Sequence, residues 1–321
     1  MENCMSKMFD EKKERYYKRE ILQTIGVENV PKTFGAEKTC YVFHSFVVFK
    51  EPLELEGDRF SFVMINKLIK QQNTNYLHNA GIKTPRIVDI YYDKGYVYEV
   101  QEKAPGMVMS YTNESNILNL FNCGIDRYVS IKDMSDGLRS DFCKKILTYN
   151  FNMQKKLKAA PLTQFVEFIK NFKAIQEYGL DLDVHGENFL YDVDKGFSFV
   201  DLPAYQSSAR KRFDITNVDS IHLNFDEKKV KKVERFRTVK NYTLMIQICG
   251  LFFDFLKYSA YCFETDLITQ MRKNNAAIIK NKILPAAKLA GINLTEQEMK
   301  SLENYIKKFI HVKNSDAVIS F

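Results

Sequence analysis

The chain has 321 residues, of which 45% are hydrophobic and 27% charged, and its formal net charge is +7 at pH 7. This balance excludes a largely disordered chain, and the length allows a sizeable buried core in one large or two medium domains. The six cysteines include no C-x-x-C pair, so the sequence predicts neither a zinc site nor a disulfide framework. We therefore expect a protein of the reducing cytoplasm.

No membrane-directed segment is predicted. The first 20 residues lack the apolar core of a signal peptide, and the longest apolar run, residues 244–256, is interrupted by Gln247 and Asp254. That run is also too short to span a bilayer. The positive charge fits an anionic ligand such as a nucleotide, but it fits a nucleic acid or an acidic surface equally well.

The N-terminal part of the chain predicts a sheet and helices. Residues 10–25 have the apolar spacing of an amphipathic helix. Residues 39–50 are nearly all β-branched or aromatic and predict strands, and residues 60–65 continue in the same style. A helix is expected over residues 66–79. Residues 81–102 then predict a turn, a strand, a tight hairpin and a second strand.

The remainder of the chain predicts mainly helices. Residues 107–178 are rich in helix, and residues 163–179 carry a single apolar face. That face is formed by Phe165, Phe168, Ile169, Phe172 and Ile175. We expect an apolar helix over residues 242–263 and two more helices over residues 266–310. The second of these begins with a capping box, T-E-Q-E, at Thr295.

Three polar residues stand out after the predicted helix 163–179: Asp183, Asn188 five positions on, and Asp201 thirteen positions after that. The apolar runs between them flank a glycine-bearing polar turn, which predicts a β-hairpin. Because a hairpin brings its outer ends together, Asn188 and Asp201 can share one Mg²⁺ ion with phosphate oxygens. Asp183 lies where a carboxylate accepts or orients a hydroxyl proton in phosphoryl transfer. The alternative is an ordinary polar hairpin whose Asp and Asn side chains cap turns.

The order and spacing of Asp183, Asn188 and Asp201 resemble the catalytic loop and metal-binding hairpin of the protein-kinase-like superfamily. With His185, the stretch D-V-H-G-E-N is similar to the D-x-H-x-x-N motif of its aminoglycoside phosphotransferase, choline kinase and lipopolysaccharide kinase branch. The chain departs from the family pattern in three places. Asp181 stands where a His is expected, Leu-Pro replaces the Phe-Gly after the last Asp, and no A-P-E follows. These departures argue against an ordinary activation loop and ordinary protein-kinase substrate binding.

The resemblance covers most of residues 35–205 and implies an α+β fold of two lobes. Residues 1–102 would form a small lobe with an antiparallel sheet and one helix. Residues 103–321 would form a larger, mainly helical lobe that carries the catalytic loop and the hairpin. ATP would bind between the lobes, with Mg²⁺ held by Asn188 and Asp201.

The resemblance also implies residues of the small lobe that hold the nucleotide. Lys50, at the end of an apolar strand, is the preferred lysine for the α and β phosphates, and Lys67 is its rival. The helix glutamate that would pair with this lysine has no match, because Lys70, Gln71 and Gln72 occupy the expected turn. The residues expected to complete the nucleotide site are Gly35, Gln72, Gln101 and Glu102.

The implied activity is an ATP- and Mg²⁺-dependent transfer of the γ-phosphoryl group to a hydroxyl of a small molecule or glycan. Asp183 would act as the base, and His185 would contact a phosphate or the substrate or brace the loop. Two alternatives stay open: a divergent protein Ser/Thr kinase of the effector type, which would act in a host cell, and an inactive pseudokinase or interaction module. The basic run at residues 207–214 would receive an anionic acceptor or the transferred phosphate, or lie solvated. The run at residues 228–240 predicts a solvated helix face, with nucleic-acid binding as the alternative, although nucleic acid is not an expected partner.

Overall fold

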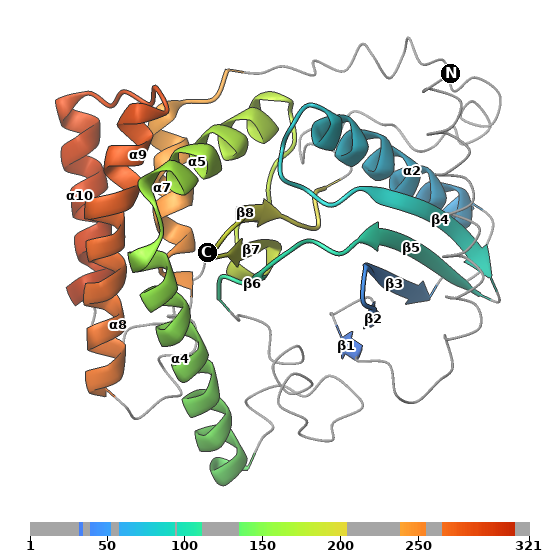
Figure 1. The fold of residues 1–321 in the computed structure, drawn as a ribbon, viewed down its shortest axis with the longest axis horizontal. Coiled ribbons are helices and arrows are strands. Elements are labelled where there is room, and N and C mark those ends of the chain that lie inside the picture. Colours follow the sequence, from blue (N-terminus) through green and yellow to red (C-terminus); the bar gives the residue numbers. More distant parts are fainter. Residues whose placement is uncertain are drawn as a thin grey trace.

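The computed structural model describes residues 32–34, 39–52, 58–93, 95–110, 135–203, 238–254 and 265–311. These residues form a sheet with one long helix and, beside it, a mainly helical part that contains a smaller sheet (Figure 1). The predicted α+β fold of a small antiparallel lobe and a larger helical lobe is confirmed. The boundary after residue 102 stays a prediction. The predicted helix at residues 10–25, Gly35 and nearly all of the two basic runs lie outside the described residues.

The larger sheet is antiparallel in its described strands, which lie in the order β1-β2-β3-β5-β4. The strands are β1 (Lys32–Phe34), β2 (Thr39–Val42), β3 (Phe46–Pro52), β4 (Ile87–Asp93) and β5 (Tyr96–Glu102). Side chains alternate between the two faces of a strand. Phe46 and Val48 therefore share one face of β3 with Lys50, whereas Phe49 and Glu51 share the other.

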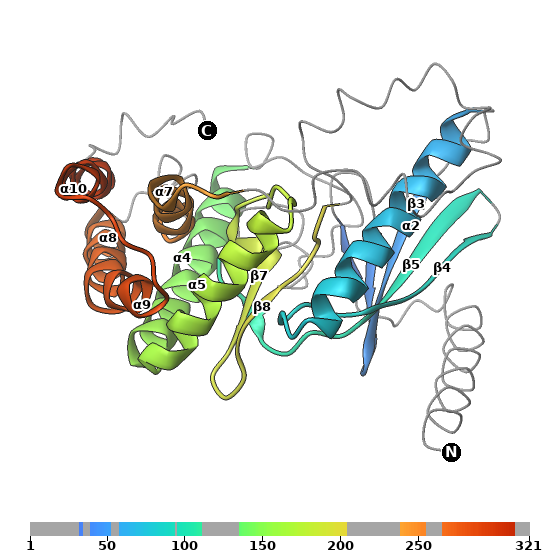
Figure 2. The ribbon, with the colours of Figure 1, turned by 90° about the horizontal axis from the view of Figure 1, so that it is seen from above.

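Helix α2 (Asp58–Asn79) connects β3 to β4 and lies along the sheet (Figure 2). The prediction of a strand over residues 60–65 is wrong, because these residues form the first turns of α2. No glycine or proline lies between Asp58 and Asn79, so nothing in the backbone interrupts the helix, and strand propensity yields to tertiary context. Gly81 follows the helix with φ +89°, a conformation that glycine adopts without strain.

A smaller antiparallel sheet is formed by β6 (Met107–Val108), β7 (Phe189–Asp192) and β8 (Gly196–Phe199). The last two strands are the predicted hairpin. Gly106 has φ +96°, and a Cβ there would lie 2.5 Å from the backbone of Tyr191. Only glycine therefore lets the segment entering β6 approach β7 this closely.

The described helices of the larger lobe are α4 (Asp136–Ala159), α5 (Leu162–Glu177), α7 (Asn241–Leu251), α8 (Thr265–Ile278), the π-helical turn η6 (Ile279–Ile283), α9 (Leu284–Leu289) and α10 (Glu296–His311). The helix predicted over residues 242–263 is too long, because α7 ends at Leu251, directly after Gly250, a residue that disfavours helix. The capping box is confirmed: Thr295 and Glu298 exchange hydrogen bonds of 2.9 and 3.2 Å. None of the helices in the described part of the chain combines the length and hydrophobicity that crossing a bilayer requires.

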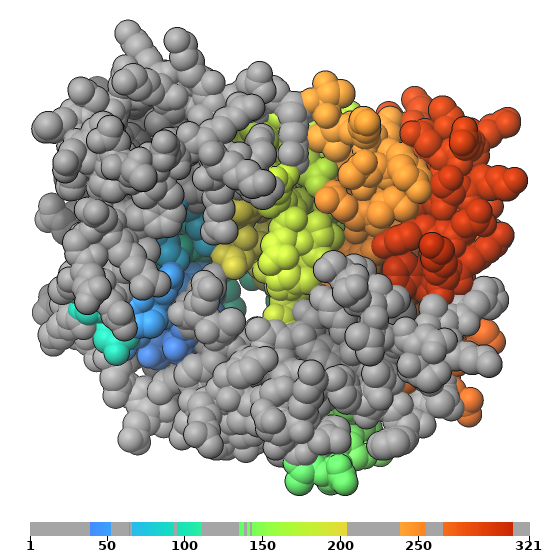
Figure 3. Space-filling view, turned by 180° about the vertical axis from the view of Figure 1, so that it is seen from behind, coloured from blue at the N-terminus to red at the C-terminus, as the bar shows by residue number. Residues whose placement is uncertain are grey.

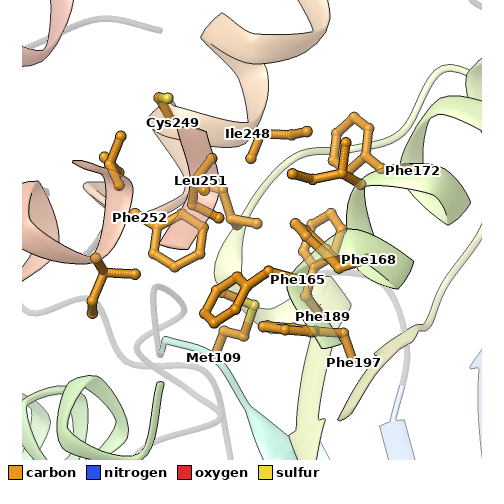
Figure 4. Close-up of a cluster of buried hydrophobic side chains, with 14 of the residues drawn as sticks. Met109, Phe165, Phe168, Phe172, Phe189, Phe197, Ile248, Cys249, Leu251 and Phe252 are labelled. Carbon is orange, nitrogen blue, oxygen red and sulfur yellow. The ribbon is translucent and has the colours of Figure 1, made fainter. Parts of the chain in front are cut away.

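The core of the larger lobe fixes the hairpin against α5 (Figure 4). The ring of Phe168 lies 4.6 Å from that of Phe197 and 5.5 Å from that of Phe199. Phe172 stacks on Phe189 at 5.9 Å. Each fully buried Phe contributes on the order of 2–3 kcal/mol by leaving water, so the hairpin and the loop before it sit on a rigid base.

The hairpin and α5 lie between the strands of the larger sheet and the C-terminal helices. Figure 3 shows their olive and lime atoms between the blue strands on one side and the orange and red helices on the other. The hairpin therefore lies in the middle of the described part of the molecule (Figure 3).

Candidate active site

The loop between α5 and the hairpin begins with a sharp change of chain direction. Gly179 has φ +104°, and its amide donates to the carbonyl of Gln176 at 3.0 Å. The next amide, of Leu180, donates to Ile175 at 3.2 Å, and the Leu180 side chain is buried in the core. The chain then leaves the core, so Asp183 emerges with 75% of its side chain exposed.

Three polar side chains hold one another in this loop. The Nε2 atom of His185 lies 3.1 Å from Oδ2 of Asp183 and 3.0 Å from Nδ2 of Asn188. The same Nδ2 atom donates to the backbone carbonyl of Asp183 at 3.1 Å. The amide nitrogen of Asn188 is thus committed to the loop, which leaves its oxygen as the group able to bind a cation.

The environment of His185 favours its charged form. Burial lowers the pKa of His185, but the hydrogen bond and charge of Asp183, with smaller effects of Glu187 and Asp254, outweigh burial and raise the pKa above its usual value. A protonated His185 donates from Nε2 to Asp183 and fixes the position of that carboxylate, and the amide of Asn188 then donates to the backbone carbonyl of Asp183 and not to Nε2. The geometry therefore gives His185 a bracing contact with the predicted base.

The middle of the loop is clamped from two sides. The amide of Gly186 donates to Oδ2 of Asp254 at 2.8 Å, and Asp254, just after α7, is buried. On the other side, a Cβ at Gly186 would lie only 1.8 Å from Oγ of Ser110. Asp254 was not predicted as a site residue. The feature of the sequence that could have identified it is that Asp254 places a charge within the apolar run 244–256.

Asp201 follows β8 and lies next to the start of the hairpin, because Val200 donates its amide to the carbonyl of Asn188 at 2.9 Å. Asp201 has φ +52°, the positive φ recorded for a non-glycine residue among those described. Asp tolerates this left-handed conformation better than most residues, and such outliers cluster at functional sites. The Oδ1 atom of Asp201 lies 2.7 Å from Nζ of Lys70, on α2.

Lys70 connects the hairpin to the larger sheet. Its Nζ atom also lies 2.9 Å from Oε1 of Glu99, on β5, whose side chain is only 1% exposed. Gln101 donates to the same Glu99 oxygen at 2.5 Å, and Lys67 donates to the other oxygen at 3.3 Å. Burial lowers the pKa of Lys70, but Glu99 and Asp201 together outweigh it and raise the pKa above its ordinary value. Lys70 is therefore a buried, charged ammonium.

The other predicted nucleotide residues lie at different distances from this cluster. Lys50 stands over the ring of Tyr96, with Nζ 3.9 Å from the ring centroid, and points to the face of the sheet opposite to Glu99. Gln72 is exposed on α2, and Glu102 pairs with Arg86 at 3.3 Å. The structure thus places Gln101 beside Lys70 but does not bring Lys50 there.

The donor set decides which metal the site fits. The described residues contain no group of three or more His, Cys, Asp or Glu side chains able to hold an ion. Asp201 and Asn188 supply one carboxylate and one amide oxygen at adjacent ends of the hairpin. Mg²⁺ is commonly bound by one or two protein groups, with waters and substrate phosphates completing its shell. The residues therefore fit Mg²⁺ that arrives with a phosphate ligand.

The order of elements now matches the sequence-based resemblance. A five-stranded sheet with α2 between β3 and β4 precedes a helical lobe whose loop and hairpin carry Asp183, Asn188 and Asp201. This is the two-lobed α+β arrangement that the resemblance implies.

Comparisons with known proteins give matches among solved structures alone. No protein-family model and no curated protein matches the sequence. Aminoglycoside phosphotransferase APH(3'')-Id from Streptomyces rimosus is similar with a TM-score of 0.36 and 9% identity, over 92% of this chain and 98% of that one. The bifunctional kinase-methyltransferase WbdD is similar at 0.30 and 11%, over 84% of this chain and 47% of that one. The pseudokinase domain of BIR2, an immune regulator of the RLK/Pelle family, is similar at 0.33 and 10%, over 90% of this chain and 76% of that one.

Proposed function

We propose that this protein is an ATP- and Mg²⁺-dependent phosphotransferase that moves the γ-phosphoryl group to a hydroxyl of a small molecule or glycan. The observation that supports the proposal is that three oxygen-bearing residues follow one another along one loop and the hairpin after it. Asn188 and Asp201 lie at adjacent ends of the hairpin, and Asp183 projects into solvent from the loop before it. Phosphoryl transfer needs this set: two ligands for one metal ion and a nearby carboxylate for the attacking hydroxyl.

Each residue has a role that follows from its contacts. Asp183 accepts the proton of the acceptor hydroxyl and orients that hydroxyl, and His185 holds the Asp183 carboxylate in place. Asn188 and Asp201 would hold Mg²⁺, which, when bound, neutralises charge on the phosphate oxygens. Asp254 keeps the loop in register through the Gly186 amide.

The class of acceptor is favoured by the motif around His185 and by the absence of A-P-E in the sequence. Both features resemble the pattern of the small-molecule branch of the superfamily. A protein acceptor is the alternative. A transfer assay with labelled ATP distinguishes the two classes of acceptor, because a protein kinase would place phosphate on added protein instead of on sugars or alcohols.

A thermal-shift experiment tests the nucleotide and metal site first. We expect ATP with Mg²⁺ to raise the melting temperature of the wild type, because a ligand that binds the folded state stabilises it by mass action. Asp201→Asn should lose the Mg²⁺-dependent part of the rise. Asn is chosen because it tolerates the positive φ of this position, so the change removes charge without adding strain.

The transfer assay then tests catalysis. Asp183→Asn should bind ATP and Mg²⁺ as the wild type does but transfer phosphate about 10²–10⁴-fold more slowly, the usual contribution of a general base. A wild type that shows no Mg²⁺-dependent shift with ATP would refute the proposed activity and leave a kinase-shaped interaction module.

A further inference from the structure

A buried lysine on α2 is placed where the proposed site needs a phosphate-binding cation. Lys70 is 7% exposed, and its Nζ atom bridges Oε1 of Glu99 at 2.9 Å and Oδ1 of Asp201 at 2.7 Å. An isolated buried ammonium is costly, so the charge depends on a carboxylate partner in this position. The lysine thus sits on the carboxylate that would hold the metal ion.

The two carboxylates differ in exposure, and therefore in their freedom to bind another cation. Glu99 is only 1% exposed, and Gln101 also donates to it, so it is a fixed anchor within the fold. Asp201 is 36% exposed and lies at the end of the hairpin. When the Asp201 carboxylate turns to a cation, Lys70 stays charged through Glu99, and its donors become available to a new anion. The phosphate oxygens that arrive with the cation can accept these hydrogen bonds.

The alternatives on the sheet and helix are placed less well. Lys50 lies on the other face of β3 and stands over Tyr96. Lys67 is one turn earlier on α2 and bonds to Glu51 at 2.8 Å and to Glu99 at 3.3 Å. Lys70, by contrast, lies 2.7 Å from Asp201.

We propose that Lys70, supplied by α2 instead of by β3, is the lysine that holds the nucleotide phosphates, and that Glu99 on β5 is its positioning residue. The lysine then lies on the helix and its carboxylate on β5, whereas the resemblance implied a lysine on a strand and a carboxylate on the helix. Phe49 pairs with Glu99 in the register of β3 and β5, so its side chain lies on the same face of the sheet as Glu99. A lysine on β3 would have to occupy that position to reach Glu99. This inference rests on the proposed function and adds the group that binds the phosphates.

The test compares ligands that differ only in phosphate. We would measure the affinity of ADP with Mg²⁺ and of adenosine by calorimetry, for the wild type and for variants. Lys70→Met removes the charge but leaves Glu99 buried and short of a partner, so the double variant Lys70→Met with Glu99→Gln is made as well. The double variant is neutral at both positions and keeps similar shapes, which protects the fold.

Both Lys70 variants should lose ADP affinity by about tenfold or more, the scale of one charge-assisted hydrogen bond to phosphate. Their adenosine affinity should equal that of the wild type, because the lysine contacts no part of the nucleoside. Glu99→Gln alone should weaken ADP less than Lys70→Met does. Lys170→Met, an exposed charge change on α5, should leave both affinities unchanged.

Two results would overturn the inference. One is wild-type ADP affinity in a folded Lys70→Met, Glu99→Gln protein. The other is loss of ADP affinity in Lys50→Met, which would return the role to β3. If the wild type binds ADP no more tightly than adenosine, the phosphate-binding role of Lys70 is refuted but the proposed function is not. If the wild type binds neither ligand, the proposed function is refuted as well.

Discussion

Replacing Lys70 with methionine should destabilise the fold as well as weaken phosphate binding. The change leaves Glu99, whose side chain is 1% exposed, without its 2.9 Å ion pair. Removing one partner of a buried pair costs about 3–5 kcal/mol, because the remaining charge stays buried. Lys67 and Gln101 still donate to Glu99, so we expect the lower end of that range, about 3 kcal/mol. The Asp201 side of the pair adds little, since that carboxylate is 36% exposed and water can solvate it.

Urea unfolding followed by circular dichroism measures this loss as a change in the free energy of unfolding at constant slope. The double variant Lys70→Met, Glu99→Gln should recover most of it, to within about 1 kcal/mol of the wild type, because no charge is then left unpaired in the core. Lys170→Met is the control and should stay within about 0.5 kcal/mol of the wild type. A single Lys70→Met protein as stable as the control would refute the buried ion cluster.

Two further changes probe the catalytic loop. Gly186→Ala should lower the free energy of unfolding by about 1–3 kcal/mol through overpacking, because the new Cβ meets Oγ of Ser110 at 1.8 Å and the Ser110 carbonyl oxygen at 2.7 Å. Adding Ser110→Gly should restore part of the loss, and an unchanged melting temperature in Gly186→Ala would contradict the close approach. For His185, the folded-state pKa is raised, so its stabilising contribution is complete below the unfolded pKa, about 6.5, and is lost as pH rises through the folded value. The difference in melting temperature between wild type and His185→Gln should therefore shrink from pH 5 to pH 9, and a difference that grows with pH would show that the pairing with Asp183 does not form.

Local patterns allowed much of the fold to be predicted. The hairpin at residues 189–199 was predicted because strand-forming runs and a glycine-bearing turn are encoded within a few residues of one another. The apolar face of α5 followed from helical spacing, and its five predicted residues are all buried. Where local signals were ambiguous the prediction failed: residues 60–65 have the composition of a strand but extend α2.

The partners of Lys70 could not be predicted in this way. Lys70 and Asp201 are 131 positions apart, and Lys70 and Glu99 are 29 apart on different elements. Their meeting depends on how α2 lies on the sheet and on the face to which each strand residue points, and a change of one residue in register would turn Glu99 away. The sequence showed a lysine where a helix carboxylate was expected, without showing what faced it.

The sequence by itself determined the hairpin, the apolar face of α5 and the spacing of Asp183, Asn188 and Asp201, because each of these depends on residues close together in the chain. Tertiary structure alone decided which cation meets Asp201, that Asp254 clamps the loop and that Lys50 faces away. These depend on packing between distant segments, where the burial of charge favours an arrangement that pairs the charged groups.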